Sequence, residues 1–286
     1  MTILLAGCGD LGTEAGLRFA AAGHRVVGWR RSPEKLPAEI EGVAADLSTA
    51  ALPAIPAGIA AVVIAVAADS PTEAAYRAAY VDGLSHVLDA LDRDGVTPRR
   101  VLFVSSTAVY GDAGGGWVDE STTAAPGGFS GRIIREAEEL LLSRLRGTGC
   151  APVVLRLGGI YGPGRTRLID QVRNGAAVAP DEPRYTNRIH RDDAAAAIVH
   201  LCTMESMPAP VYVGVDNEPA DLGDVLGFLA SEMGYAEPPI GPAGEARGGN
   251  KRCSNALLRS TGFEFAYPSF REGYRDILAG RGARHP

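Results

Sequence analysis

The chain has 286 residues, 46% of them apolar, so it can bury a sizeable core in one large domain or in a domain with a smaller lobe. A formal net charge of −6 argues against nucleic acid as a partner, because phosphate binding needs clustered Lys and Arg. The four cysteines lie far apart, which predicts reduced thiols and no metal site. The most apolar stretch, 59–68, is too short for a bilayer, which takes about 20 residues. We therefore expect a cytoplasmic protein that binds no membrane.

Short apolar strands alternate with helices through the first half of the chain. The pattern predicts strands at 2–6, 25–29, 43–45, 60–67, 101–105 and 153–157, and helices at 13–22, 72–91 and 130–145. The run 60–67 is continuously apolar, as in a strand covered on both faces. This alternation predicts the α/β class with a doubly wound parallel sheet, the Rossmann fold.

Beyond residue 157 the pattern loosens, with frequent Pro and Gly between short segments. We assign 1–157 to the Rossmann domain and 189–215 to a strand and helix that return to it. The ranges 158–188 and 216–286 are assigned to a smaller C-terminal lobe, which would bind a substrate.

A GxGxxG sequence lies between the first strand and the first helix and consists of Gly7, Cys8, Gly9, Asp10, Leu11 and Gly12. The first glycine makes the tight turn, the second leaves room for a pyrophosphate, and the third lets the helix pack on the strand. The helix N-terminus then offers free N–H groups to the phosphates. This context predicts binding of a nicotinamide dinucleotide.

Basic residues follow the second strand, where an NAD site usually carries Asp or Glu for the ribose 2′-hydroxyl. Arg30 and Arg31 stand there, and Ser32 adds a hydroxyl. A guanidinium suits a 2′-phosphate, which a carboxylate would repel. The sequence therefore predicts NADP as the cofactor, with NAD as the alternative. A solvated basic turn is the other interpretation of the two arginines.

Several further motifs appear in a fixed order: Asp46-Leu47, residues 65–68, 103–111 (FVSSTAVYG), 156–164 (RLGGIYGPG) and 187–193 (NRIHRDD). Together they resemble the extended and atypical short-chain dehydrogenase/reductases, the group of nucleotide-sugar epimerases and dehydratases. The resemblance runs along nearly the whole chain.

The resemblance implies a role for each motif. It places Asp46 and Leu47 at the adenine and Ala65, Val66 and Ala67 at the nicotinamide ribose, with Ser105 also on the cofactor. It implies a catalytic hydroxyl at Ser106, which would hydrogen-bond a substrate carbonyl or alcohol. The alternative for that hydroxyl is a cap at the end of its strand. Substrate contacts are implied for Thr107, Tyr110 and Tyr161.

The acid–base pair of that family, YxxxK, is absent between residues 110 and 150. Alignment on Gly131 and Glu138 puts Ser130 at the Tyr position and Ile134 at the Lys position. The alternative with Phe129 at the Tyr position puts Ile133 at the Lys position, so it also lacks a Lys. A serine hydroxyl without a neighbouring cation is a poor acid or base. The sequence also has Tyr80 where the family often has Asn.

Two functions remain open at this point. The first is an NADP-dependent oxidoreductase or epimerase-like enzyme that acts on a small carbonyl or sugar-type substrate, with its proton from water, Tyr161 or Tyr110. The second is a non-catalytic NADP(H)-binding sensor or scaffold.

Two surface features are also open. Apolar residues at helical spacing could pair two copies into a homodimer or pack against the sheet; they are Leu84, Val87, Leu88 and Leu91. Lys251-Arg252 could meet an anion, although solvated charge is the simpler interpretation.

Overall fold

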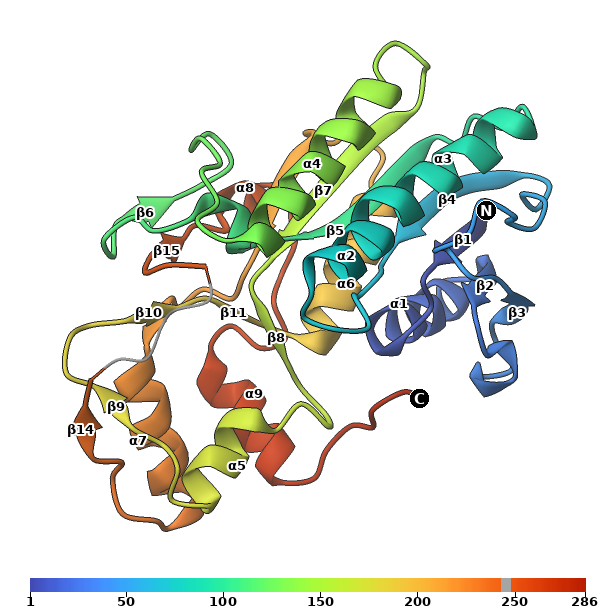
Figure 1. Ribbon diagram of the computed structural model, residues 1–286. Helices are drawn as coiled ribbons and strands as arrows, with labels where there is room; N and C mark the ends of the chain where they lie inside the picture. Colours follow the sequence, from blue (N-terminus) through green and yellow to red (C-terminus); the bar gives the residue numbers. More distant parts are fainter. Residues whose placement is uncertain (243–247) are drawn as a thin grey trace.

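A seven-stranded parallel sheet forms the centre of the computed structural model, which describes residues 1–242 and 248–286 (Figure 1). The strand order is β12-β7-β5-β4-β1-β2-β3, so the direction of winding reverses beside β1. The strands are β1 (Thr2–Ala6), β2 (Arg25–Arg30), β3 (Glu41–Ala44), β4 (Ile59–Ile64), β5 (Arg100–Ser106), β7 (Ala151–Leu157) and β12 (Val211–Gly214). The predicted α/β class and doubly wound sheet are confirmed.

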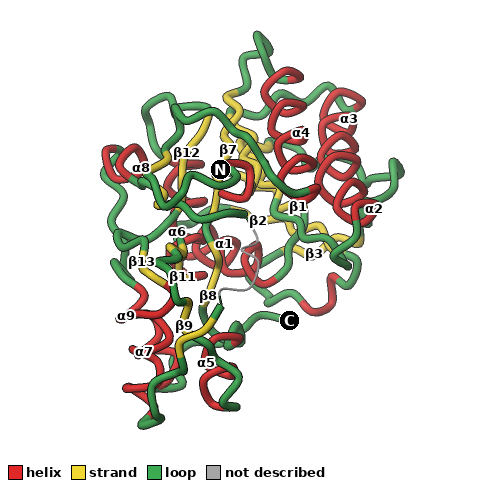
Figure 2. Tube along the Cα trace, turned by 60° about the vertical axis from the view of Figure 1, so that its left-hand side comes forward, coloured by secondary structure: helices red, strands yellow, loops and turns green. Residues whose placement is uncertain are grey.

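Helices cover both faces of this sheet. Alternate side chains of a strand point to opposite faces, and along β1 Ile3 and Leu5 pack with Phe19 of one helix layer, whereas Leu4 packs with Leu88 of the other. Helices α3 and α4 lie side by side in both views (Figures 1 and 2). The first layer contains α1 (Asp10–Ala21) and α6 (Arg191–Thr203), and the second contains α3 (Gly83–Arg93) and α4 (Phe129–Arg144).

Three of the predicted elements differ most from the structure. Helix α1 begins at Asp10 rather than at 13, because the amide of Thr13 already bonds the carbonyl of Gly9 at 2.7 Å. Strand β4 ends at Ile64, since its neighbour β1 ends at Ala6. The helix predicted over 72–91 is divided into α2 (Glu73–Tyr76), a π-helical turn η2 (Arg77–Asp82) and α3.

A smaller group of helices lies at one end of the molecule, visible at the bottom of Figure 2. The helices α5 (Arg167–Arg173), α7 (Leu222–Met233) and α9 (Phe270–Leu278) share an apolar cluster of their own. Residues 243–247 of the predicted lobe lie outside the described residues. Outside the central sheet, the described residues form short strand pairs: β8 (Gly159–Tyr161) with β11 (Arg188–His190), β9 (Ala179–Pro180) with β14 (Ile240–Gly241), β10 (Tyr185–Thr186) with β13 (Ala220–Asp221), and β6 (Trp117–Val118) with β15 (Arg252–Cys253). The remaining elements are η1 (Pro33–Lys35), η3 (Thr107–Tyr110) and α8 (Ala256–Ser260).

The strand expected to return to the central sheet near residue 189 does not join it. Ile189 pairs with Ile160 of β8 instead. The edge beside β7 is taken by β12, where Val211 lies opposite Val154. Helix α6 between them packs on the central sheet.

The apolar face of α3 packs inward. The four leucine and valine side chains that could have met a second copy are at most 3% exposed and belong to the cluster under the sheet. The structure therefore favours the sheet-packing alternative for them. Within residues 1–242 and 248–286, no helix is long and apolar enough to cross a membrane.

Candidate functional site

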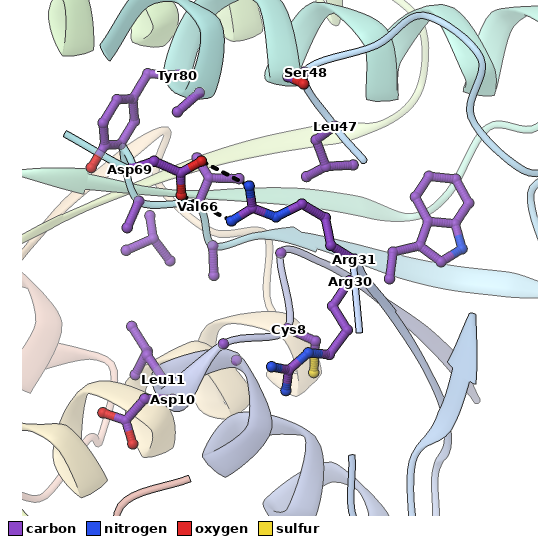
Figure 3. A pocket seen from close by; sticks show the side chains of 18 of the residues that line it. Cys8, Asp10, Leu11, Arg30, Arg31, Leu47, Ser48, Val66, Asp69 and Tyr80 are labelled. Atoms are coloured by element: carbon purple, nitrogen blue, oxygen red, sulfur yellow. Dashed lines mark hydrogen bonds and ion pairs between the residues drawn. The ribbon is translucent and has the colours of Figure 1, made fainter. Parts of the chain in front are cut away.

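A cavity of about 790 Å³ lies at the carboxyl ends of the central strands (Figure 3). Its wall contains every residue that the sequence assigned to the cofactor: the loop 7–12, residues 30–32, 46–47, 65–67 and 105. Ligands of open α/β sheets bind at this edge, where the strand order reverses. The fold thus gathers these segments from the ends of five strands, β1 to β5.

The geometry of the glycine loop fits the close approach of a phosphate group. Gly7 has a φ of 89°, and a Cβ there would lie 2.6 Å from the carbonyl oxygen of Ala65. A Cβ on Gly12 would lie 2.8 Å from the carbonyl oxygen of Gly7. A Cβ on Gly9 would meet no protein atom within 4 Å, so the open space beside it is available to a ligand.

The two arginines after β2 point in different directions (Figure 3). Arg31 reaches Asp69 in a bidentate ion pair, with N–O distances of 2.8 and 2.9 Å. Arg30 points toward the glycine loop beside Cys8. Lys35 lines the same cavity, which the sequence reasoning missed. The lining of the cavity therefore includes three cations, of which Arg31 is paired with Asp69.

Asp10 opens helix α1 on the cavity wall, and arginines compensate its charge. Arg165 donates to one carboxylate oxygen at 3.0 Å, and Arg191 donates to the other at 3.1 Å. Burial raises the pKa of Asp10, but the bonds from Arg165 and the backbone of His285 outweigh it, so the net pKa is lowered. The carboxylate stays ionised without leaving an uncompensated negative charge beside the glycine loop.

Ser106 ends β5 on the cavity wall. Its hydroxyl oxygen accepts a hydrogen bond from the amide of Ala108 at 3.2 Å, so it caps η3. Because the oxygen acts as the acceptor, its hydrogen stays available to donate to a ligand. The cap and a contact with a ligand are therefore compatible.

A buried ion pair lies directly behind Ser106. Ser105 donates to Glu138 at 2.6 Å, and Arg156 donates two bonds to the same carboxylate at 2.9 and 2.7 Å. Glu138 is fully buried and Arg156 is 3% exposed. Burial lowers the pKa of Arg156, but the bonds to Glu138 raise it more, and the net pKa is raised. This network fixes the end of β5 to α4 and β7.

The three residues expected to contact substrate do not line the cavity. Thr107 is buried, and Tyr110 is 3% exposed beneath the guanidinium of Arg156, which lies 4.8 Å from its ring centre. Tyr161 is buried against His190 and Tyr274, and its hydroxyl donates to the carbonyl of Ser269 at 3.3 Å. Neighbouring elements cover all three side chains, and their roles as substrate contacts stay predictions.

The cavity has an apolar side chain where the family has its lysine. Ile134 lines the wall, whereas Ser130 is not part of it. Tyr80 is the one tyrosine among the described lining residues, and it comes from the π-helical turn. Burial and the neighbouring Tyr76 raise the pKa of Tyr80 to about 12, so its hydroxyl is protonated at neutral pH. The replacement of Asn by Tyr was the sequence signal for this residue.

Lys251 is neither solvated nor at the cavity. It is 3% exposed and donates to the carbonyls of Gly111 and Gly248, and burial lowers its pKa. Solvated charge is therefore the wrong interpretation for this lysine, which joins the turn after η3 to the segment before β15.

In the described part of the chain, no group of three or more His, Cys, Asp or Glu side chains is placed to hold a metal ion.

Known proteins share this architecture. A structure of a candidate NAD-dependent epimerase/dehydratase from Methylobacillus flagellatus is 37% identical, covers 98% of both chains and has a TM-score of 0.78. Protein YeeZ of Escherichia coli K12 is 32% identical over 175 residues, which span 59% of this chain and 59% of YeeZ. Human epimerase family protein SDR39U1 with NADPH shares the fold at 18% identity, with a TM-score of 0.79 over 98% of this chain and all of that chain.

The sequence model of the NAD dependent epimerase/dehydratase family matches residues 3–214. That range contains the glycine loop, the cations after β2 and the end of β5 with Ser106. The chain belongs to the NAD dependent epimerase/dehydratase family.

Proposed function

We propose that the chain is an NADP-dependent oxidoreductase or epimerase-like enzyme that acts on a small carbonyl or sugar-type substrate. One observation carries the proposal: a single cavity extends from Arg30 at the end of β2 and Lys35 of η1 to Ser106 at the end of β5. The open space beside Gly9 fits a pyrophosphate. When bound, NADP would supply or accept a hydride at its nicotinamide ring.

The cations after β2 are the basis for preferring NADP to NAD. Arg30 would bind the 2′-phosphate, since Arg31 is already paired with Asp69. Asp46 lines the same cavity, and two bonds from Ser48 lower its pKa and keep it ionised, so the phosphate would be held by the cations and not by Asp46. The human relative is described with NADPH, which agrees with this choice at the level of the fold.

Ser106 would donate a hydrogen bond to the substrate oxygen. Tyr80 is our candidate for holding the proton, in place of the tyrosines that the structure buries elsewhere. Ile134 supplies no cation to lower the pKa of Tyr80, so this hydroxyl is a weaker acid than the family's tyrosine. We therefore expect slow proton transfer.

Calorimetric titration of NADPH and NADH tests the cofactor assignment. Arg30→Ala should lower the affinity for NADPH by roughly ten- to a hundredfold, because a hydrogen bond to a charged group is lost, and should change the affinity for NADH by less than about twofold. Arg25→Ala is the matched control, because it removes the same charge at the opposite end of β2. Equal affinities of the wild-type protein for the two dinucleotides would refute the preference for NADP.

A non-catalytic NADP(H) sensor or scaffold is the second candidate. The apolar Ile134 at the cavity wall favours it, because the family's proton relay has no cation here. Incubation with NADPH and a panel of carbonyl compounds, followed at the nicotinamide absorbance, separates the two. Tight binding with no oxidation of NADPH would establish the sensor.

Assembly and location stay predictions. The outer faces of α3 and α4 are charged, with Arg144 bonded to Asp89 at 2.9 Å and to Asp92 at 2.6 Å. A homodimer through these helices would therefore rest on polar contacts, and light scattering at micromolar concentration tests it. The four cysteines are buried and free, which supports the proposed cytoplasmic location.

A further inference from the structure

The segment 281–286, here called the strap, connects the lobe to the cofactor cavity. It follows α9 and runs back toward α1, where Figure 1 marks the end of the chain. Arg284 donates to the carbonyl of Gly164 at 3.0 Å, and Arg191 donates to the carbonyl of Ala283 at 2.9 Å. The strap is thereby fixed along the loop between the lobe and the central sheet.

The far end of the strap bonds to three residues of the cofactor region. The amide of His285 donates to Asp10 at 3.2 Å, and its ring nitrogen Nε2 lies 2.9 Å from the carboxylate of Glu14. Arg30 donates from Nη1 to the backbone oxygen of Pro286 at 3.1 Å, across 256 residues of sequence. Asp10 and Arg30 both line the cavity.

This last contact occupies the side chain that we assign to the 2′-phosphate. A guanidinium binds a phosphate most strongly through two parallel N–H groups. In Arg31 both terminal nitrogens are paired with Asp69. In Arg30 the Nη1 edge is engaged by the strap. A phosphate that approaches this edge must displace the backbone oxygen of Pro286.

We propose that the strap determines the selectivity between NADP and NAD. It binds Arg30 until a 2′-phosphate takes the place of Pro286 on the guanidinium. The inference rests on the proposed function, since it assigns Arg30 to that phosphate. NAD has no 2′-phosphate and does not compete for Arg30, so its affinity should not depend on the strap. The strap therefore lowers the affinity for NADP selectively.

Deletion of residues 283–286 tests the proposal, with NADPH and NADH titrated by calorimetry. NADPH should bind roughly three- to tenfold more tightly than to the full chain, because one charged hydrogen bond no longer has to be exchanged. NADH should change by less than twofold. In the Arg30→Ala background the same deletion should change neither affinity.

A second variant controls for an effect of the deletion on folding. Arg284→Ala removes the bond to Gly164 but leaves Asp10, Glu14 and Arg30 intact, and it should shift NADPH in the same direction by a smaller factor. Weaker NADPH binding in both variants, with thermal unfolding unchanged, would show that the strap supports the site and would overturn the proposal. An unchanged NADPH affinity in the deletion would also overturn it.

The affinities of Arg30→Ala distinguish a failure of the proposed function from a failure of the inference about the strap. If Arg30→Ala does not reduce NADPH selectivity in the full chain, the cofactor assignment itself is wrong, and the inference about the strap is wrong with it. If Arg30→Ala reduces selectivity and the deletion does not raise it, only the inference about the strap is wrong.

Discussion

Removal of the carboxylate of Glu138 should destabilise the fold strongly. In Glu138→Ala, the guanidinium of Arg156 stays buried at 3% exposure with two hydrogen bonds lost, and Ser105 loses its acceptor. Breaking a buried ion pair on one side typically costs about 3–5 kcal/mol. We expect a loss in this range, because the ring of Tyr110 beside Arg156 replaces only part of the lost interaction.

The assay is urea unfolding at pH 7, followed by fluorescence and circular dichroism. The double variant Glu138→Ala/Arg156→Ala should lose less than the sum of the two single losses, by about 2 kcal/mol or more, since it leaves no unpaired charge. Arg135→Ala is the control. It removes a partly exposed partner of Glu138 at 3.6 Å and should cost at most about 1 kcal/mol. Additive losses in the double variant would refute the assignment of the pair as one coupled unit.

Three further predictions concern the cavity and the lobe. Ser106→Ala should lower turnover of NADPH about 100-fold, which is the usual effect of removing an oxyanion donor. Ser130→Ala should leave turnover within about threefold of the wild-type rate. The reverse ranking would place the chemistry at Ser130. Tyr80→Phe should slow turnover about 100-fold with the Kd of NADPH unchanged, and full activity would mean that water supplies the proton. Burial raises the pKa of Asp216 from 3.8 to about 8. Between about pH 4 and 8 the folded state therefore binds a proton that the unfolded state has lost, and the free energy of unfolding should fall as the pH rises through this range. In Asp216→Asn that fall should be smaller, which Tm measurements at pH 5 and 8.5 would show; an identical fall would contradict the assignment.

The cofactor loop was predictable because its signals are local. Residues 7–12 follow an apolar strand and precede a helix, and this order alone fixes the turn that a pyrophosphate requires. The boundaries of the elements were less predictable. The π-helical turn at 77–82 and the early end of β4 depend on neighbouring strands and helices, which leave no periodic signature in the sequence.

The tyrosines show why the catalytic end was harder. Tyr110 and Tyr161 matched family motifs, yet packing against Arg156 and Tyr274 removes both from the cavity. Tyr80 was only a departure from the family's Asn, and the turn between α2 and α3 carries it onto the wall. Motif spacing gives the position of a side chain along the chain, but the elements packed around it decide which surface it reaches.

The sequence by itself determined the α/β class and the parallel sheet, because the alternation of strands and helices is visible along the chain. It also determined the dinucleotide loop, the basic residues at the end of β2 and the absence of the YxxxK pair, because each depends on residues that are neighbours in the sequence. Only the tertiary structure decided how the two arginines differ. Arg31 pairs with Asp69, 38 residues away, and Arg30 with Pro286, 256 residues away. Contacts over such separations arise when the sheet and the lobe bring distant loops together, and no periodicity or spacing in the sequence encodes them.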